Sequence, residues 1–332
     1  MIRHWLVLCA VLGACSSSDN KDEACAAVAK ARCLRLSNCS SSDFQRQWAD
    51  EATCEERLKL SCLTGLDAEG TGSTPETVQA CAAAIPNQTC QDFFQGGTPT
   101  ECLPVAGTLA NGTPCIASSE CSSTFCAVPA HAKCGACAPL PQAGDSCEVI
   151  GCGGRGLICD GVTKQCVTPV PAGGTCSSGD PCISGYTCVR PPGQPTGSCM
   201  QQGVTAGTTC DPAHRTAADC NRDAGLYCDS ATKLCKVLSY AAASAPCGNI
   251  SGVVTVCTAG ALCTQNKTCS APVLEGMSCD PVYGPPCLSP ARCVIPNSSP
   301  GSDAGIAPNS DAGPPAMPGT CVISDSSMCP AK

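Results

Sequence analysis

Residues 143–166 read AGDSCEVIGCGGRGLICDGVTKQC, and this arrangement of four cysteines occurs six times between Gly112 and Cys329. A turn of small residues comes before the first cysteine, and in the second to fifth units a short step led by Gly comes before the third. A polar turn then separates the third cysteine from the fourth. A period of roughly 30 residues indicates an array of small repeated units. The units open at Cys115, Cys147, Cys176, Cys210, Cys247 and Cys279.

Each unit holds the cysteines for two disulfide bridges. Closing a loop of about 10–20 residues stabilises a fold by about 3 kcal/mol in chain-entropy estimates, and pieces of roughly 30 residues rarely fold without cross-links. We therefore expect residues 105–332 to form about six short β-hairpin modules, with a polar hairpin at Tyr227–Cys235. The spacing leaves the pairing open for the cysteines of the second, third and fourth units, which are Cys147, Cys152, Cys159, Cys166, Cys176, Cys182, Cys188, Cys199, Cys210, Cys220, Cys228 and Cys235.

The first and last units depart from this pattern. The last unit carries an insert, about residues 296–320, which is rich in Pro, Gly, Ser and Asp and is expected to be disordered. Its aspartates do not have the spacing of a calcium-binding loop. The first and last units also hold a fifth cysteine each, Cys137 and Cys329. A bridge between these two would close the array on itself, and local pairing is the alternative.

Composition places the chain among disulfide scaffolds. Its 332 residues include 36 Cys, about 11%, which exceeds the roughly 8–10% that marks this class. Aromatic residues make up only 3%, so little large apolar surface is available for a core. So many thiols imply an oxidising compartment. The formal net charge of −8 argues against nucleic acid as a partner.

The first fifteen residues predict export and lipid anchoring. A short basic start precedes the apolar run Trp5–Ala14, which is too short to span a bilayer and is typical of a secretory signal. The run ends in Leu12-Gly13-Ala14-Cys15, which resembles the lipobox of bacterial lipoproteins. The resemblance implies cleavage after residue 14, a lipid on the Cys15 sulfur and, from the serine that follows, sorting to the outer membrane.

The alternative is an ordinary leader that is cut near Ala14 and leaves a free cysteine. Cysteine counting favours the lipoprotein, because removing Cys9 with the leader and lipidating Cys15 leaves an even 34 cysteines for bridges. Residues 1–14 are then the signal peptide, and residues 15–23 form a short polar tether.

Residues 24–104 are predicted to form a separate helical domain. The stretches 22–36 and 44–63 are rich in good helix formers, and Ser42 fits a helix start. A third helix is expected over Pro75–Ala84, with its cysteine facing inward. The scarce aromatic side chains are expected in the core of this domain, namely Phe44, Trp48, Phe93 and Phe94.

Cysteine spacing suggests how two of these helices are joined. Cys25 and Cys33 are eight positions apart, as are Cys54 and Cys62. Eight residues make about two and a quarter helical turns, so both members of each pair lie near one face. Two antiparallel helices can therefore be joined by Cys25–Cys62 and Cys33–Cys54, although the sequence alone does not determine connectivity.

The spacing Cys-x(4–9)-Cys-x(4–7)-Cys-x(5–10)-Cys, with Gly before the first and third cysteines, resembles the amino-terminal cysteine-rich motif of Dickkopf proteins. It is also distantly similar to EGF-like modules. Several such repeats behind a lipoprotein leader look like bacterial cysteine-rich outer-surface lipoproteins. The resemblance covers most of residues 112–329 and rests on Cys and Gly spacing. It implies a disulfide-rich β-hairpin fold and carries over no signalling activity, because the chain has no counterpart motif.

The sequence offers no arrangement that is typical of catalysis. Cys134-Gly135-Ala136-Cys137 has the spacing of a redox pair, but no strand and helix start are predicted around it, so we expect a structural role. His131 and His214, the two histidines after the leader, lie in separate loops without paired metal ligands. We predict a protein that is not an enzyme and that uses no metal or cofactor.

These features together predict an exported lipoprotein at the outer membrane or cell surface. Its array is expected to extend away from the membrane and to display loops for adhesion, recognition of an extracellular protein or glycan, or envelope scaffolding. The alternative is a secreted inhibitor of proteases or other enzymes, because bridged loops suit rigid binding to a cleft. The sequence does not indicate the oligomeric state.

Overall fold

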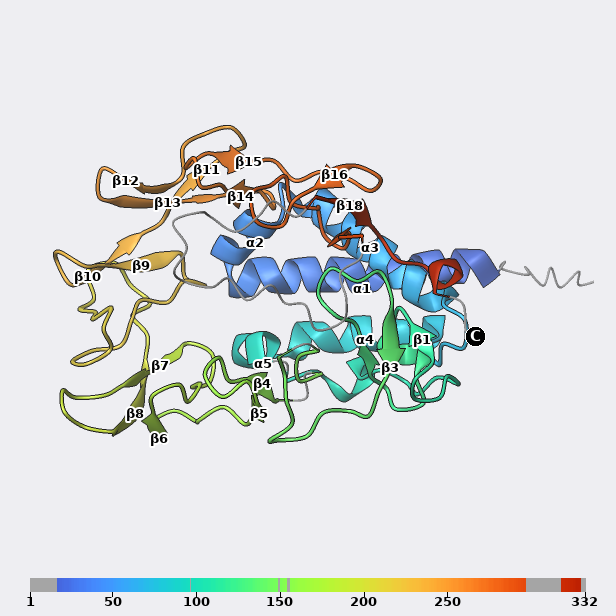
Figure 1. Ribbon diagram of the computed structural model, residues 1–332, viewed down its shortest axis with the longest axis horizontal. Helices are drawn as coiled ribbons and strands as arrows, with labels where there is room; N and C mark the ends of the chain where they lie inside the picture. Colours follow the sequence, from blue (N-terminus) through green and yellow to red (C-terminus); the bar gives the residue numbers. More distant parts are fainter. Residues whose placement is uncertain (1–16, 96, 149, 154–155, 297–317, 330–332) are drawn as a thin grey trace, which may run out of the picture.

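The structure, a computed structural model, describes residues 17–95, 97–148, 150–153, 156–296 and 318–329. The expected signal peptide, the lipobox and Cys15 lie outside the described residues, as do residues 297–317 of the insert. Figure 1 shows a helical domain at the centre with small strand pairs arranged around it. None of the described helices combines the length and the apolar character that crossing a membrane requires.

The helical domain is built on its three longest helices, α1, α3 and α4, and α1 contacts both of the others. The helix predicted over Pro75–Ala84 has these bounds in the structure, and its Cys81 is buried at 6% exposure. Short helices and 3-10 turns complete the domain. Its elements are α1 (Ser17–Cys39), α2 (Ser41–Gln47), α3 (Glu51–Asp67), α4 (Pro75–Ala84), η1 (Ile85–Asn87), α5 (Cys90–Gln95) and η2 (Thr100–Cys102).

Helix α1 begins earlier than predicted, so most of the segment expected as a polar tether (residues 15–23) is helical. Lys21 donates to the carboxylate of Asp67 at 2.6 Å, and Lys59 forms an ion pair with Asp22 at 2.7 Å. Both partners lie on α3, so these polar residues hold the first turns of α1 against it. The polar residues that suggested a tether therefore belong to helix α1, where two of them form ion pairs with α3.

The second predicted helix is divided into α2 and α3. Ser40, two positions before the expected Ser42, is the N-cap of α2 and accepts from the backbone N–H of Asp43 at 2.9 Å. Asp50 is the N-cap of α3 and accepts from the N–H of Thr53 at 2.7 Å. Each cap side chain satisfies a backbone donor that a helix start would otherwise leave free, which fixes two helix starts within one helix-forming stretch.

Bridges and aromatic packing hold the helices together. Trp48 is 3% exposed and packs with Leu36, and Phe44, Phe93 and Phe94 pack around it as predicted. The two pairs suggested by the eight-residue spacing are present. The bridges of the domain are Cys25–Cys62, Cys33–Cys54, Cys39–Cys90 and Cys81–Cys102.

The described part of the remaining chain forms seven small sheets. Pairing is antiparallel throughout these sheets except between β11 and β13, and the hairpin predicted at Tyr227–Cys235 is present as β9 and β10. The three-stranded sheets are β1 (Pro114–Cys115), β3 (Gly135–Cys137) and β2 (Cys126–Ala127); β6 (Thr175–Ser177), β8 (Thr196–Gln201) and β7 (Tyr186–Val189); β11 (Ser239–Ala241), β13 (Val253–Cys257) and β12 (Gly248–Ile250); and β16 (Ser278–Cys279), β18 (Gly319–Val322) and β17 (Arg292–Val294). The hairpins are β4 (Ile158–Cys159) with β5 (Cys166–Val167), β9 (Leu226–Asp229) with β10 (Leu234–Val237), and β14 (Leu262–Cys263) with β15 (Cys269–Ser270). Two 3-10 turns, η3 (Ser118–Glu120) and η4 (Ser326–Met328), lie in the same part of the chain.

Every unit opens with the same hydrogen-bonded turn. The residue three positions before the first cysteine has a positive φ and donates its N–H to the carbonyl of the fourth cysteine at 2.7–2.9 Å. Glycine, which adopts this conformation without strain, occupies the position in five units, and Ser244 occupies it in the fifth unit. The fourth cysteine returns its N–H to the next carbonyl at 2.8–3.0 Å. The small residues before each first cysteine therefore join the two ends of the unit.

The residue two positions before the fourth cysteine divides the units into two kinds. In the first, third and sixth units it is a strand glycine, and a Cβ there would come within 2.0–2.6 Å of a carbonyl oxygen on the facing strand. In the second, fourth and fifth units it is Lys164, Lys233 or Lys267, each with φ of 55–56°. Glycine thus permits a close strand approach and a longer hairpin, while the left-handed lysine makes a tight turn.

The array does not extend away from the helices, contrary to expectation. In Figure 1 it runs from β1 and β3 along one side of the helical domain, turns at β7–β10 near the far end of α1, and returns along the opposite side to β16–β18. The first and last units thus meet at one end of α1. The units form a ring around the helical domain, and the first, fourth, fifth and sixth units are hydrogen-bonded to it.

Candidate functional site

The candidate site is the disulfide ring, because it contains the twelve cysteines of the second to fourth units that the sequence analysis named. In each unit the first cysteine is bonded to the third and the second to the fourth. For the predicted cysteines, the pairs are Cys147–Cys159, Cys152–Cys166, Cys176–Cys188, Cys182–Cys199, Cys210–Cys228 and Cys220–Cys235. The other three units follow the same rule with Cys115–Cys126, Cys121–Cys137, Cys247–Cys263, Cys257–Cys269, Cys279–Cys293 and Cys287–Cys321.

One bridge closes the ring, and it uses a different cysteine from the one expected. Cys137 is the fourth cysteine of the first unit and is bonded to Cys121, while Cys134 is bonded to Cys329 across a sequence separation of 195. Cys137 is the last residue of β3, whereas Cys134 lies just before this strand. The side chain of Cys137 is bonded inside its own unit, and that of Cys134 reaches the last unit.

The motif Cys134-Gly135-Ala136-Cys137 does not form a redox pair in the structure. Its two cysteines belong to separate bridges, so they are not bonded to each other as thioredoxin-like spacing would allow. Sets of three cysteine sulfurs within 4.8 Å of one another occur in several units. Bridged sulfur offers no thiolate, which is the form that binds metal or attacks a substrate.

Hydrogen bonds support the closure beside the Cys134–Cys329 bridge. His131 Nδ1 lies 3.2 Å from the carbonyl oxygen of Cys293, and Ile295 donates its N–H to the carbonyl of His131 at 3.2 Å. Ser324 Oγ donates to the carbonyl of Lys133 at 2.5 Å. His131 therefore joins the first unit to the last, a contact between distant segments that no local sequence signal indicates.

Arg57 on α3 joins the helical domain to the last unit. Arg57 is 5% exposed, and its guanidinium pairs with both carboxylate oxygens of Glu275, which lowers the pKa of that carboxyl. It also donates to the carbonyls of Leu288 at 3.1 Å and Ser289 at 2.9 Å. Leu288 in turn packs against the Trp48 cluster. With four hydrogen bonds to three residues of the last unit, this buried cation fixes the ring on the helices.

Three further contacts fix the ring at other points. Ala259 and Gly260 of the fifth unit donate their N–H groups to the carbonyls at the end of α2 at 2.9 and 2.7 Å. Ser40 Oγ donates to the carbonyl of Asp223 in the fourth unit at 2.6 Å. In the first unit, the carbonyl of Ser119 accepts from the N–H of Gly72 at 2.8 Å. The helical domain therefore positions units at both ends of α1.

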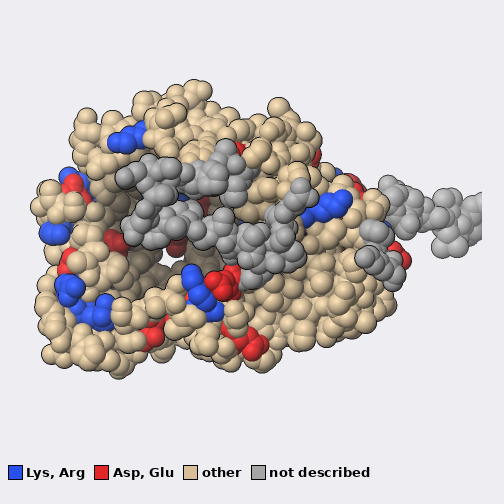
Figure 2. All heavy atoms as spheres, in the orientation of Figure 1, with Lys and Arg blue, Asp and Glu red and all other residues tan. Residues whose placement is uncertain are grey.

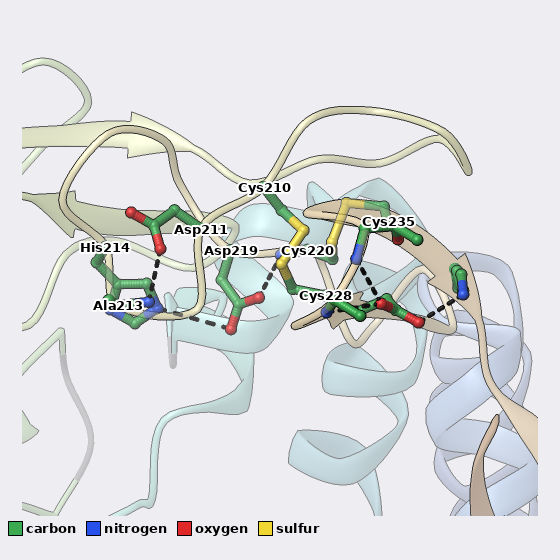
Figure 3. The surroundings of a disulfide bond; sticks show 12 residues. Cys210, Asp211, Ala213, His214, Asp219, Cys220, Cys228 and Cys235 are labelled. Atoms are coloured by element: carbon green, nitrogen blue, oxygen red, sulfur yellow. Dashed lines mark hydrogen bonds and ion pairs between the residues drawn. A yellow bond between two sulfur atoms is a disulfide. The ribbon is translucent and has the colours of Figure 1, made fainter. Parts of the chain in front are cut away.

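A histidine–aspartate pair that the sequence did not reveal lies in the fourth unit (Figure 3). His214 Nε2 lies 3.7 Å from a carboxylate oxygen of Asp219, and each side chain is more than one-third exposed. Beside it, Asp211 accepts from the N–H groups of Ala213 and Arg215, which lowers its pKa to about 2. The sulfurs drawn around the pair are bridged, so none of these four cysteines supplies a thiolate nucleophile to it. We interpret the pair of His214 and Asp219 as part of a loop whose shape is fixed by the hydrogen bonds of Asp211.

Charge on the face drawn in Figure 2 is sparse, with Lys, Arg, Asp and Glu scattered among uncharged residues.

Comparison of the chain with known protein families, with characterised proteins and with solved structures finds no match.

Proposed function

We propose that the chain is an exported, lipid-anchored protein that acts without catalysis, as a rigid binding, adhesion or scaffold body at the bacterial outer membrane or cell surface. The observation that carries the proposal is complete bridging: all 34 cysteines from Cys25 onward are paired, including the pair that closes the ring. A fold that depends on 17 bridges requires an oxidising compartment. The resemblance to Dickkopf-like and EGF-like repeats on lipoprotein leaders supports the same assignment.

The anchor would hold the helical domain close to the membrane. Cys15 stands two residues before the start of α1, so a lipid on its sulfur would be followed almost directly by helix. At about 1.5 Å per residue, the 23-residue helix α1 spans about 35 Å. The units around β7–β10, which lie at the far end of α1 in Figure 1, are then the part of the ring displayed furthest from the anchor.

Exposed apolar side chains in the third to fifth units, two of which contain β7–β10, favour a protein or glycan partner. Large apolar side chains that remain exposed can mark contact surfaces when they gather. Six of them fall within about fifty residues of sequence, in the third to fifth units. They are Met200, Val204, Leu234, Val237, Ile250 and Val253, with exposures from 37% to 61%.

The test compares the membrane retention of Cys15→Ala with that of the parent chain, expressed with its own leader in a bacterium. The matched control is Cys9→Ala, because this cysteine lies in the expected leader and should be removed with it. The parent and the control should partition with the outer membrane, carry the mass of residues 15–332 plus acyl groups, and show no thiol that reacts before reduction. Cys15→Ala should be soluble.

Two results would contradict the proposal. Unchanged membrane retention of Cys15→Ala would remove the anchor. Reactive thiols in the exported parent chain would remove the bridged ring and favour metal or redox chemistry instead. A parent chain that is exported but never lipidated would favour the alternative, a secreted inhibitor.

A further inference from the structure

An arginine stands in the buried stripe of helix α1. Positions 25, 28, 29, 32 and 36 share one face of this helix, because residues three and four apart lie one above the other. Cys25, Val28, Ala29 and Leu36 on this face are at most 9% exposed. Arg32, in the middle of the same face, is exposed instead. A packed helix with a charged residue at a core position indicates an opening next to that residue.

The Arg32 guanidinium has no partner among the described residues. Two other arginines of the helical domain do have partners: Arg35 donates to the carbonyl of Gln88, and Arg57 pairs with Glu275. No hydrogen bond or ion pair of this kind is formed by Arg32. The surrounding protein lowers the pKa of Arg32 through desolvation, yet an arginine keeps its charge at neutral pH. The fold therefore holds an unpaired cation beside apolar helices.

Two cavities meet at this cation. One, of about 220 Å³, lies between α1, α3 and α4 and is lined by apolar residues such as Val28 and Val78. The other, of about 440 Å³, is lined by apolar and aromatic residues of α1 and α5, including Phe93 and Phe94. Arg32, Leu58 and Cys102 line both. We call the two cavities together the α1 groove. Its size and its mixture of apolar walls and few polar groups are typical of a small-molecule site.

A second polar group in the groove also lacks a partner. Trp48 lines the larger cavity and is 3% exposed, and its indole Nε1–H is buried without a hydrogen-bond acceptor. A buried donor is normally satisfied, so an orphaned one requires an explanation. An oxygen atom of a bound molecule would provide the acceptor. The cation and the indole N–H thus both lack an acceptor in one groove.

The carboxylates that line the groove do not satisfy the cation. Asp43 is paired with Arg46, its neighbour on α2. Glu101 lines the smaller cavity and is exposed, and the structure shows no hydrogen bond or ion pair between it and Arg32. A ligand anion would therefore meet a cation that is free to bind it.

We propose that the α1 groove binds an amphiphile with one apolar chain and one carboxylate, of the fatty-acid class. The carboxylate pairs with the Arg32 guanidinium, the indole N–H of Trp48 donates to a ligand oxygen, and the chain lies against Phe93 and Phe94. Charge-assisted hydrogen bonds of a guanidinium to a carboxylate are among the stronger polar contacts. The assignment is independent of how the protein is localised.

The test uses the fluorescence of Trp48, which is the single tryptophan of the chain after Trp5 in the expected leader. The exported, oxidised Cys15→Ala chain is titrated with dodecanoate below its micelle concentration, so that no acyl group of its own competes. We expect a saturable change that fits one site. Arg32→Gln should weaken binding roughly 10- to 100-fold, the effect expected for a lost charge-assisted contact.

The matched control is Lys30→Gln, which removes one positive charge from an exposed position of the same helix. It should bind dodecanoate within about twofold of the parent chain. No saturable fluorescence change, or equal affinities for Arg32→Gln and Lys30→Gln, would overturn the proposal. If Arg32→Gln fails to fold, the parent chain alone decides: dodecanoate should bind at least tenfold more tightly than dodecanol and dodecyltrimethylammonium, and equal affinities would refute a role for the cation.

Discussion

Opening the ring is the sharpest test of the architecture. The double variant Cys134→Ser, Cys329→Ser removes one bridge and leaves the two bridges of every unit intact. Because the first and last units also share the His131 and Ser324 contacts, we expect the variant to fold but to lose stability. Both serines are close in size to cysteine, so the main change is the lost cross-link.

The magnitude follows from the loop that this bridge closes. The two cysteines are 195 residues apart, but the ten bridges inside the loop shorten the covalent path to about 100 residues. Closure entropy depends on the logarithm of loop length, so both lengths give about 5 kcal/mol. Measured bridges fall below this figure, because unfolded chains are not fully random. We therefore expect a loss of about 2–4 kcal/mol.

The assay is unfolding in guanidinium chloride without reductant, followed by Trp48 fluorescence. Leu288 of the last unit packs against the Trp48 cluster, so this signal reports how the ring sits on the helices. The control is Cys182→Ser, Cys199→Ser, which opens one local loop and should leave the Trp48 transition nearly unchanged. Coincident unfolding curves for the ring-opened and parent chains, with the missing bridge verified by mass, would refute the reasoning.

Three further predictions concern single positions. Arg57→Met should lower the free energy of unfolding by about 2–3 kcal/mol, because it leaves a carboxylate and two carbonyls without their buried donor; thermal unfolding without reductant measures this. The pKa of Asp211 falls from 3.8 to about 2 on folding, so its stabilisation is present above pH 3.8 and is lost as the pH falls toward 2. Asp211→Asn should therefore remove part of the acid sensitivity of its loop, as read by amide exchange between pH 2 and 4. Gly197→Ala should destabilise the third unit by about 1–3 kcal/mol, because its Cβ would lie 2.0 Å from the carbonyl oxygen of Val189, while Gly161→Ala, with open space around it, should be neutral.

Local chemistry explains what the sequence predicted correctly. The helix Pro75–Ala84 has proline at its start and a threonine cap before it, and both signals are read within a few residues. The hairpin at Tyr227–Cys235 and the eight-residue cysteine spacing are equally local. Cysteine counting predicted a fold held by many bridges, because an even number of exported thiols has few other uses.

The path of the array could not be predicted, because it depends on contacts between distant segments. Whether Cys134 or Cys137 forms the closing bridge depends on which of the two side chains is directed toward the last unit. That choice has meaning only when the last unit is in place beside the first. The buried Arg57 and its exposed partner Glu275 are likewise 218 residues apart, and the sequence around Arg57 does not distinguish it from an exposed charge.

The two kinds of unit were visible in the sequence but were missed. Gly-x-Cys ends the first, third and sixth units, as in Gly197-Ser198-Cys199, and Lys-x-Cys ends the other three, as in Lys233-Leu234-Cys235. Cysteine spacing alone does not distinguish the two kinds of unit. The residue two positions before the last cysteine was the available signal, because a strand that approaches this closely has no room for a side chain.

Ring and helical domain stabilise each other by different means. The units bury mainly cysteine and contribute few large apolar side chains, whereas the helices supply an aromatic cluster and the buried Arg57. Among the described residues, the second and third units form no hydrogen bond or ion pair with the helices; these contacts come from the first, fourth, fifth and sixth units. The second and third units are thus held at both ends by neighbours that the helices position. Closing the ring at Cys134 and Cys329 fixes the near end of that span, because the first unit is then bonded to the last, which Arg57 holds.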